Sequence, residues 1–324
     1  LKNYKPGTLE PVKAVDIAQN HIVKERVKKE LGIVGLGKMG SNLAESLKEK
    51  GWFIVGYDKN IINLEWEGMH ISNSIKEAIE RLTKPRVLWT MVPHGVLDSV
   101  LFENGGLSEL LEEGDTIIDG GNNFYKDSAR RYKKLKQKGI NFIDVGVSGG
   151  PEGARYGASL MIGGDRKTFE HFEQLFYDVA REGGYEFFEG AGAGHFVKAI
   201  HNGIEYGMMQ SIAEGFTVLK KSKYNLDLNK IASVYSHGSV IESRLIEWLH
   251  GAFELYGENL NAASGSVGHG ETANWTLQAA EDLDLRTKII EEALKFREQS
   301  EKNPSYTGKI LTALRNQFGG HPLK

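Results

Sequence analysis

The 324-residue sequence contains no cysteine. This absence excludes disulfide bonds, thiolate metal sites and a cysteine nucleophile. The sequence also lacks an apolar run of the length that crosses a bilayer, and its first residues lack the apolar core of a signal peptide. Its formal net charge is only −3, which gives no reason to expect nucleic acid or an anionic membrane as a partner. We therefore expect a cytoplasmic protein that acts on a small molecule.

Short apolar runs alternate with amphipathic segments between residues 30 and 191. The expected strands cover residues 30–37, 53–58, 86–93, 115–122, 141–150 and 159–165, and the expected helices 41–51, 75–82, 126–139 and 172–182. This alternation predicts an α/β domain with a parallel, doubly wound (Rossmann) sheet. From residue 192 to residue 324 helical spacing dominates, which predicts an all-α domain. Residues 1–29 form an N-terminal extension with one amphipathic, helix-like piece.

A glycine-rich loop follows the first expected strand. Gly35, Gly37 and Gly40 have the G-x-G-x-x-G spacing, a helix follows them, and the next strand ends at Asp58. This context favours a dinucleotide site over a plain strand–turn–helix with a capping acid. A carboxylate at Asp58 suits the ribose diol of NAD and repels the extra phosphate of NADP, although Lys59 softens that repulsion. No metal is expected.

Two further glycine clusters follow later strands, at residues 119–123 and 147–164. Ordinary turn chemistry explains either cluster alone. Together they predict a substrate floor beside the cofactor, in which Asn122 and Ser148 contact hydroxyls and the glycines offer bare N–H groups. The run Met91 to Pro93 is expected near the nicotinamide, although an ordinary strand exit explains it nearly as well.

The stretch "GHFVKAIHNGIEYG" gathers polar residues on one face of an expected helix. Lys198, His201, Asn202 and Glu205 stand at i, i+3, i+4 and i+7. Flanking glycines favour an active-site helix over a solvated face. Burial lowers the pKa of a lysine, so Lys198 suits a general base, and Glu205 can return a proton to carbon. The apolar stripe that should anchor the helix consists of Val197, Ile200, Ile204 and Met208.

These motifs together resemble the short type of decarboxylating 6-phosphogluconate dehydrogenases. The resemblance rests on "GLGKMG", "IIDGGNN", "GVSGGPEGARYGASLMIGG", "GAGHFVKAIHNGIEYGMMQ" and "ALRNQFGGH". It implies oxidation of 6-phosphogluconate by NAD, loss of carbon dioxide and release of ribulose 5-phosphate, with Lys198 as base and Glu205 as acid. The implied cofactor contacts are Gly35, Leu36, Gly37, Lys38, Met39, Gly40, Asp58, Lys59, Met91, Val92, Pro93 and Asn122. The implied substrate contacts are Asn122, Ser148, Gly149, Gly150, His201, Asn202, Tyr206, Arg297, Arg315 and His321.

The resemblance also implies an oligomer. In the family the tail with Arg315 and His321 reaches from a second subunit, so we expect a homodimer or homotetramer with exchanged tails. One departure is the loop before Trp275, which lacks the family's lysine and offers His269 instead. Two alternatives remain: an NAD-dependent dehydrogenase of another β-hydroxyacid, of the hydroxyisobutyrate type, and a dinucleotide-binding module without catalysis.

Overall fold

The computed structural model describes residues 28–61, 66–268 and 270–324 of the chain. The helix expected within residues 1–29 and the side chain of His269 lie outside these ranges.

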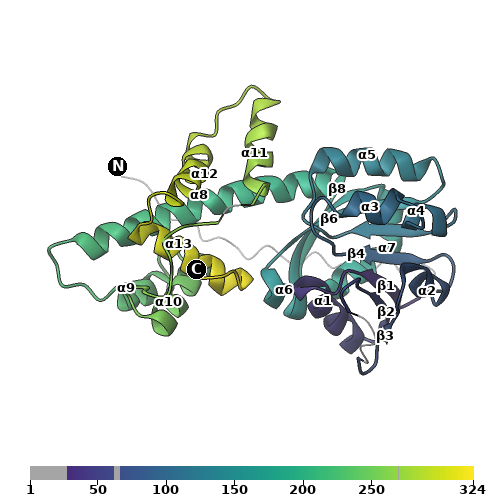
Figure 1. The fold of residues 1–324 in the computed structure, drawn as a ribbon, viewed down its shortest axis with the longest axis horizontal. Helices are drawn as coiled ribbons and strands as arrows, with labels where there is room; N and C mark the ends of the chain where they lie inside the picture. Colours follow the sequence, from purple (N-terminus) through teal and green to yellow (C-terminus); the bar gives the residue numbers. More distant parts are fainter. Residues whose placement is uncertain (1–27, 62–65, 269) are drawn as a thin grey trace, which may run out of the picture.

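The described residues form one sheet and a series of helices (Figure 1). The strands are β1 (Glu30–Val34), β2 (Phe53–Tyr57), β3 (His70–Ile71), β4 (Val87–Thr90), β5 (Thr116–Asp119), β6 (Asn141–Ser148), β7 (Ala158–Gly164) and β8 (Ala180–Glu189). The helices of the sheet domain are α1 (Lys38–Glu49), α2 (Ile75–Glu80), α3 (Leu97–Phe102), α4 (Leu107–Leu110), α5 (Tyr125–Lys136), α6 (Gly150–Tyr156) and α7 (Arg166–Val179). The later helices are α8 (Ala193–Lys221), α9 (Leu228–Tyr235), α10 (Arg244–Tyr256), α11 (Thr272–Glu281), α12 (Lys288–Ser300) and α13 (Tyr306–Gly319).

The sheet has the strand order β3-β2-β1-β4-β5-β6-β7-β8. Strands β1 to β6 are parallel to their neighbours, as expected, but β7 runs antiparallel to β6. The expectation of a wholly parallel sheet was therefore wrong. Only nine residues, 149–157, connect β6 to β7. A parallel return needs a crossover of a dozen residues or more, so this short connection forces the chain to turn back beside β6.

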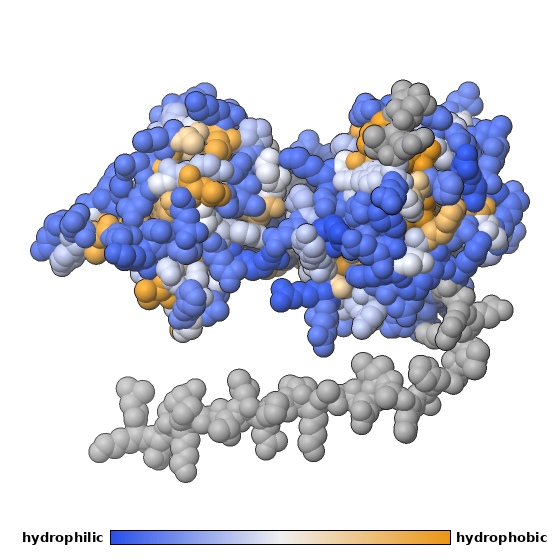
Figure 2. Space-filling model, turned by 90° about the horizontal axis from the view of Figure 1, so that it is seen from below, coloured by the Kyte–Doolittle hydropathy of each residue, from blue (hydrophilic) through white to orange (hydrophobic). Residues whose placement is uncertain are grey.

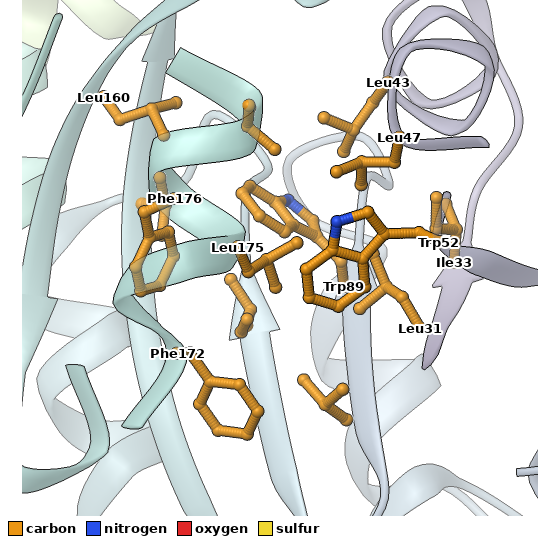
Figure 3. Packing of buried hydrophobic residues seen from close by; sticks show 14 of the residues in the cluster. Leu31, Ile33, Leu43, Leu47, Trp52, Trp89, Leu160, Phe172, Leu175 and Phe176 are labelled. Atoms are coloured by element: carbon orange, nitrogen blue, oxygen red, sulfur yellow. The ribbon is translucent and has the colours of Figure 1, made fainter. Parts of the chain in front are cut away.

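Helices cover both faces of the sheet. Apolar residues of α1 and α7 pack on one face, and residues from α2 to α5 pack on the other. Figure 3 shows the first of these layers, where Trp52 and Trp89 lie between Leu43 and Leu47 of α1 and the α7 side chains Phe172, Leu175 and Phe176. A sheet buried on both faces requires nearly continuous apolar strands, which accounts for runs such as "TIID".

The second domain is built around α8. This 29-residue helix, about 43 Å long at 1.5 Å per residue, begins beside β6 and β7 and crosses into the helical lobe (Figure 1). Its far half packs with α9, α10 and α13 in a separate apolar core. Figure 2 shows the two lobes and the narrower waist between them. Although α8 is long, neither it nor any other helix within the described ranges is apolar enough to span a membrane.

Sequence patterns missed several short or exposed elements, namely β3, α3, α4, α6 and β8. Strand β8 was read in part as the end of the preceding helix, which was expected to reach Glu182 but ends at Val179. Half of the β8 residues are exposed because the strand lies at the edge of the sheet, and Phe187 is its buried residue. An exposed edge strand lacks the apolar run by which buried strands are recognised.

Candidate active site

The glycine loop joins β1 to α1, and its three glycines have different reasons to be there. Gly35 has φ +100°, and a Cβ on it would lie 2.6 Å from the carbonyl oxygen of Met91. A Cβ on Gly40 would lie 1.9 Å from the carbonyl oxygen of Gly35. Gly37 has φ −66°, and a Cβ there would meet no protein atom within 4 Å. Neither backbone nor packing requires glycine at Gly37, so the open space fits the close approach of a ligand's phosphates at the start of α1.

Asp58 follows β2 and reaches across this loop. Its Oδ2 accepts a hydrogen bond from the backbone N–H of Leu36 at 2.9 Å, and its Oδ1 accepts one from Asn60 at 2.9 Å. Both bonds fix the carboxylate beside the loop, where the ribose of a dinucleotide would lie. Lys59 is exposed. A carboxylate in this position fits the ribose diol of NAD.

The chain beyond β4 lies beside the glycine loop. The Met91 N–H donates to the carbonyl oxygen of Val34 at 2.7 Å, which extends the sheet to the glycine loop. A Cβ on Gly121 would lie 2.9 Å from the carbonyl oxygen of Val92, so the residues after β4 adjoin the turn that carries Asn122, which is exposed. A Cβ on Gly120 would lie 1.9 Å from Nε1 of Trp89, so packing inside the domain explains why this residue is glycine.

Helix α8 crosses the sheet closely because glycines line the crossing. A Cβ on Gly146 of β6 would lie 2.3 Å from the Cβ of Lys198, and one on Gly194 would lie 2.4 Å from the carbonyl oxygen of Met161. Asp144 of β6 fixes the start of the helix, since its carboxylate accepts from the N–H groups of Gly192 at 2.6 Å and His195 at 2.8 Å. These contacts press Lys198 against the sheet and leave it only 8% exposed.

The buried Lys198 has polar neighbours but no ion pair with a carboxylate among the residues that the structure describes. Burial lowers its pKa from the ordinary 10.5 to about 8, and the more distant charge of Glu205 only partly opposes this. Its Nζ lies 3.4 Å from Nδ1 of His201. The same Nδ1 lies 3.1 Å from Oδ1 of Asn202 and 3.8 Å from Oε2 of Glu205.

His201 is the centre of this cluster. Its Nε2 lies 3.1 Å from the hydroxyl of Ser148 at the end of β6. Burial, and then the charge of Lys198, lower its pKa, which favours the neutral imidazole at neutral pH. The structure thus brings together the predicted Ser148, Lys198, His201, Asn202 and Glu205.

The apolar stripe was expected to anchor this part of α8, and that expectation was wrong. Ile204 is 53% exposed and Met208 43% exposed, whereas Asn202 and Tyr206 are buried. Val197 and Ile200 are only partly buried. The polar face is the inner one because it packs on β6 at Gly146 and contacts α11, where the hydroxyl of Thr276 donates to the carbonyl oxygen of Ala199 at 2.6 Å.

Cations gather beyond Tyr206. Arg297 is 1% exposed, and its guanidinium carbon lies 3.4 Å from the centre of the Tyr206 ring. Burial and the nearby charge of Arg315 lower the pKa of Arg297, and burial also lowers the pKa values of Arg315 and His321. A buried guanidinium next to a second one is costly without an anion, so this arrangement fits a phosphate.

The tail that carries His321 packs against its own chain. The Lys38 Nζ donates to the carbonyl oxygen of Gly320 at 3.2 Å, and a Cβ on Gly150 would lie 2.3 Å from the carbonyl oxygen of Phe318. Within one chain the tail thus lies near Arg297, and the exchange of tails between subunits stays a prediction. The contact with Phe318 also explains why residue 150 is glycine.

Sequence reasoning missed the residues that hold the site together. Asp144, Gly146 and Gly194 set the crossing of α8, and a second contact between the domains joins Nε2 of His94 to a carboxylate oxygen of Glu271 at 2.9 Å. Asp144 could have been noticed as an acid inside a buried strand, because a buried carboxylate ordinarily accepts hydrogen bonds that stabilise the fold.

The α/β domain with its glycine loop, followed by an all-helical domain, is the architecture of a dinucleotide-dependent dehydrogenase. Residues 30–190 match the family model of the NAD binding domain of 6-phosphogluconate dehydrogenase, and residues 194–318 match that of its C-terminal domain. The chain belongs to the 6-phosphogluconate dehydrogenase family.

Two relatives match nearly their whole length. The Bacillus subtilis (strain 168) protein YqeC, named provisionally as a 6-phosphogluconate dehydrogenase, is 45% identical over 90% of this chain and 98% of its own. The NAD(+)-dependent, decarboxylating 6-phosphogluconate dehydrogenase of Haloferax volcanii is 32% identical over 91% of this chain and 98% of its own.

Solved structures agree on the fold. Plasmodium falciparum 6-phosphogluconate dehydrogenase, studied in its apo form, with NADP+ and with 6-phosphogluconate, is 27% identical with a TM-score of 0.73 over 88% of this chain and 70% of its own. The 3-hydroxyisobutyrate dehydrogenase of Salmonella typhimurium is 21% identical with a TM-score of 0.68 over 87% of this chain and 98% of its own. The latter likeness concerns the fold alone.

Proposed function

We propose that this protein oxidises 6-phosphogluconate with NAD and decarboxylates the product to ribulose 5-phosphate. The observation that carries the proposal is the position of Lys198: a buried amine with its pKa lowered to about 8, between the glycine-lined crevice and the cationic cluster around Arg297. Family membership and the named activity of the Haloferax volcanii relative support the same reaction.

In this proposal Lys198 first acts as a base. Its neutral amine takes the proton of the carbon-3 hydroxyl while a hydride leaves carbon 3, and NAD, when bound, accepts that hydride. Ser148 and His201, 3.1 Å apart, hold the hydroxyl in place. The charged Lys198 then donates that proton to the carbonyl oxygen, which becomes negative as the bond to the carboxylate breaks and carbon dioxide leaves, so the amine is neutral again.

Glu205 acts in the final step. Loss of carbon dioxide leaves an enediol, which must gain one proton on carbon and lose one from oxygen. In this proposal a protonated Glu205 delivers the first proton, and the neutral amine of Lys198 accepts the second. Since His201 lies 3.4 Å from Lys198 and 3.8 Å from Glu205, it separates the two titrating groups and keeps both at the pocket.

Arg297, Arg315, His321 and Tyr206 hold the 6-phosphate in this proposal. These cations distinguish the protein from dehydrogenases of unphosphorylated β-hydroxyacids, because such a substrate would leave the buried Arg297 without an anion. Initial rates with 6-phosphogluconate and with gluconate, under NAD and under NADP, with release of carbon dioxide followed, test the assignment. We expect turnover of 6-phosphogluconate with NAD; equal activity on gluconate would contradict it.

Replacement of the base gives a second test. Lys198→Ala should abolish NADH production and leave NADH binding within about twofold, because the lysine lies at the reacting end of the site. Lys221→Ala is the matched control, since it removes the same charge from the exposed end of the same helix. Substantial turnover in Lys198→Ala would exclude Lys198 as the base.

We also propose a homodimer or homotetramer. The support is an uncharged, exposed stripe on α8, which includes Ile204, Met208 and Val218 (70% exposed). Figure 2 shows apolar patches on the surface of the helical lobe on the face in view. Light scattering tests the assembly. The expected cytoplasmic location stays a prediction, which cell fractionation tests.

Exchange of tails between subunits, implied by the resemblance, can be tested by co-expression of Lys198→Ala and Arg315→Ala chains. If tails are exchanged, a mixed pair contains one complete site and regains activity. If each chain uses its own tail, as the contact between Lys38 and Gly320 supports, every site stays defective.

A further inference from the structure

Lys38 lies between the cofactor loop and the C-terminal tail. It is the first residue of α1 and follows Gly37, so its backbone stands where the dinucleotide's phosphates are expected. Its side chain extends away from the loop, and its Nζ donates to the carbonyl oxygen of Gly320 at 3.2 Å. Gly320 ends α13 in the left-handed conformation, φ +59°, and a Cβ on it would lie 3.0 Å from this Nζ.

The tail that Lys38 holds also carries the cationic cluster. His321 follows Gly320 directly, and Arg315 lies one turn earlier than Gly319 on α13. Burial lowers the pKa of His321, and the charges of Arg315, Lys38 and Arg297 lower it further. The cations Lys38, Arg297 and Arg315 therefore converge around the His321 imidazole, and the charge of Glu205 reaches both arginines. Such a cluster repels itself until an anion binds.

We propose that Lys38 couples the binding of the cofactor to the binding of the substrate's phosphate. The inference rests on the proposed function, because it takes 6-phosphogluconate as the anion. Phosphate bound to Arg315 and His321 would fix the tail, and the fixed tail would hold Lys38 through Gly320. A pyrophosphate at the start of α1 would fix the same lysine from the other side. Each ligand thus reduces the conformational entropy that Lys38 and the tail must lose when the other ligand binds.

Lys38 is a positioning residue in this proposal, since it lies away from the reacting carbon. Coupling of two sites is reciprocal, so it is measurable with either ligand. NADH with 6-phosphogluconate forms a complex that cannot turn over, which allows an equilibrium measurement. NADH fluorescence gives the Kd of NADH alone, with saturating 6-phosphogluconate, and with gluconate as the ligand that lacks phosphate.

For the wild type we expect 6-phosphogluconate to tighten NADH binding about fivefold or more, the low end of usual coupling between sites. Gluconate should leave the Kd unchanged. Lys38→Met should lose most of this tightening whatever its Kd for NADH alone, because the ratio of the Kd values with and without 6-phosphogluconate measures the coupling. Lys38→Arg should restore it, because arginine can donate to Gly320. Lys48→Met removes the same charge from the other end of α1 and should behave as the wild type.

The outcomes separate this inference from the proposed function. If the wild type does not bind 6-phosphogluconate at all, the proposed function fails. If it binds 6-phosphogluconate without tightening NADH, or if Lys38→Met keeps the full tightening, the role of Lys38 is refuted while the proposed function stands. A denaturant melt like that of the wild type shows that the Lys38→Met variant is folded.

Discussion

Gly146→Ala is the substitution that tests the site most directly, because it adds one methyl group behind Lys198. The new Cβ would lie 2.3 Å from the Cβ of Lys198, 2.9 Å from its Cγ and 3.2 Å from the carbonyl oxygen of Gly194. Carbon atoms in contact are ordinarily about 3.5–4.0 Å apart. Helix α8 must therefore move away from β6 by about 1 Å or more, and Lys198 must move with it.

Two losses follow from this movement. Overpacking of a tight contact costs about 1–3 kcal/mol of unfolding free energy. A misplacement of about 1 Å at a catalytic group can reduce the rate by about 100-fold. Water that enters beside Lys198 should also raise its pKa from about 8 toward 10.5. At pH 7 the neutral fraction would then fall from about one in ten to, at the limit, about one in three thousand.

The assay is the pH profile of kcat/KM for 6-phosphogluconate, together with a denaturant melt. The base is active when neutral, so kcat/KM should fall tenfold per pH unit below the pKa of Lys198. In the wild type this fall should begin near pH 8, and in Gly146→Ala it should begin at higher pH. Gly215→Ala is the matched control, because a Cβ at this position on α8 meets no atom within 4 Å. A folded Gly146→Ala enzyme with the wild-type profile would refute the packing argument.

Three other substitutions probe separate parts of the site. Lys198→Met should raise the free energy of unfolding at pH 7 by up to about 3 kcal/mol, since the folded pKa of about 8 lies below the ordinary 10.5. The wild type should become more stable between pH 8 and pH 10.5, because the unfolded chain binds more protons there, and the variant should lack this rise. Denaturant melts at several pH values measure both effects. Asp58→Asn should improve the use of NADP relative to NAD about fivefold or more, because one like-charge contact at about 4 Å in water is worth about 1 kcal/mol; an unchanged ratio of kcat/KM values would place the ribose elsewhere. Arg315→Ala should raise the KM for 6-phosphogluconate about 10- to 100-fold, the usual worth of a charge-assisted hydrogen bond, and an unaltered KM would mean that the phosphate binds elsewhere.

The parts of the fold that follow local rules could be predicted from the sequence. The helix expected over residues 41–51 is the body of α1, in which Leu43 and Leu47, four residues apart, share a buried face, and Asp58 follows the second strand beside the glycine loop. The reversed direction of β7 was also implicit in the sequence, since nine connecting residues cannot form a parallel crossover. Strand β8 could not be found by its pattern, because an edge strand needs few buried residues.

The sequence predicted which side chains form the site, but it did not predict the residues that position them. Lys198 and Glu205 stood out because polar groups on a helix require an explanation. Gly146 and Asp144 belong to a strand about fifty residues earlier, and nothing local links them to α8. Only the assembled sheet shows that Gly146 lies under Lys198 and that Asp144 caps the helix, so these contacts depend on tertiary structure.

The two faces of α8 reverse the usual arrangement of a surface helix. Its inner face buries Lys198 and Asn202, while its outer face exposes Ile204 and Met208. In a surface helix the inner face is ordinarily the apolar one, since an unpaired buried charge is costly and large exposed apolar patches promote association. Both departures have one explanation if each face has a partner: a charged substrate and its cofactor on the inner face, and a second copy of the chain on the outer face. Substitution of Ile204 by glutamate should then weaken subunit association, and the buried polar face of the separated chain should still bind NADH.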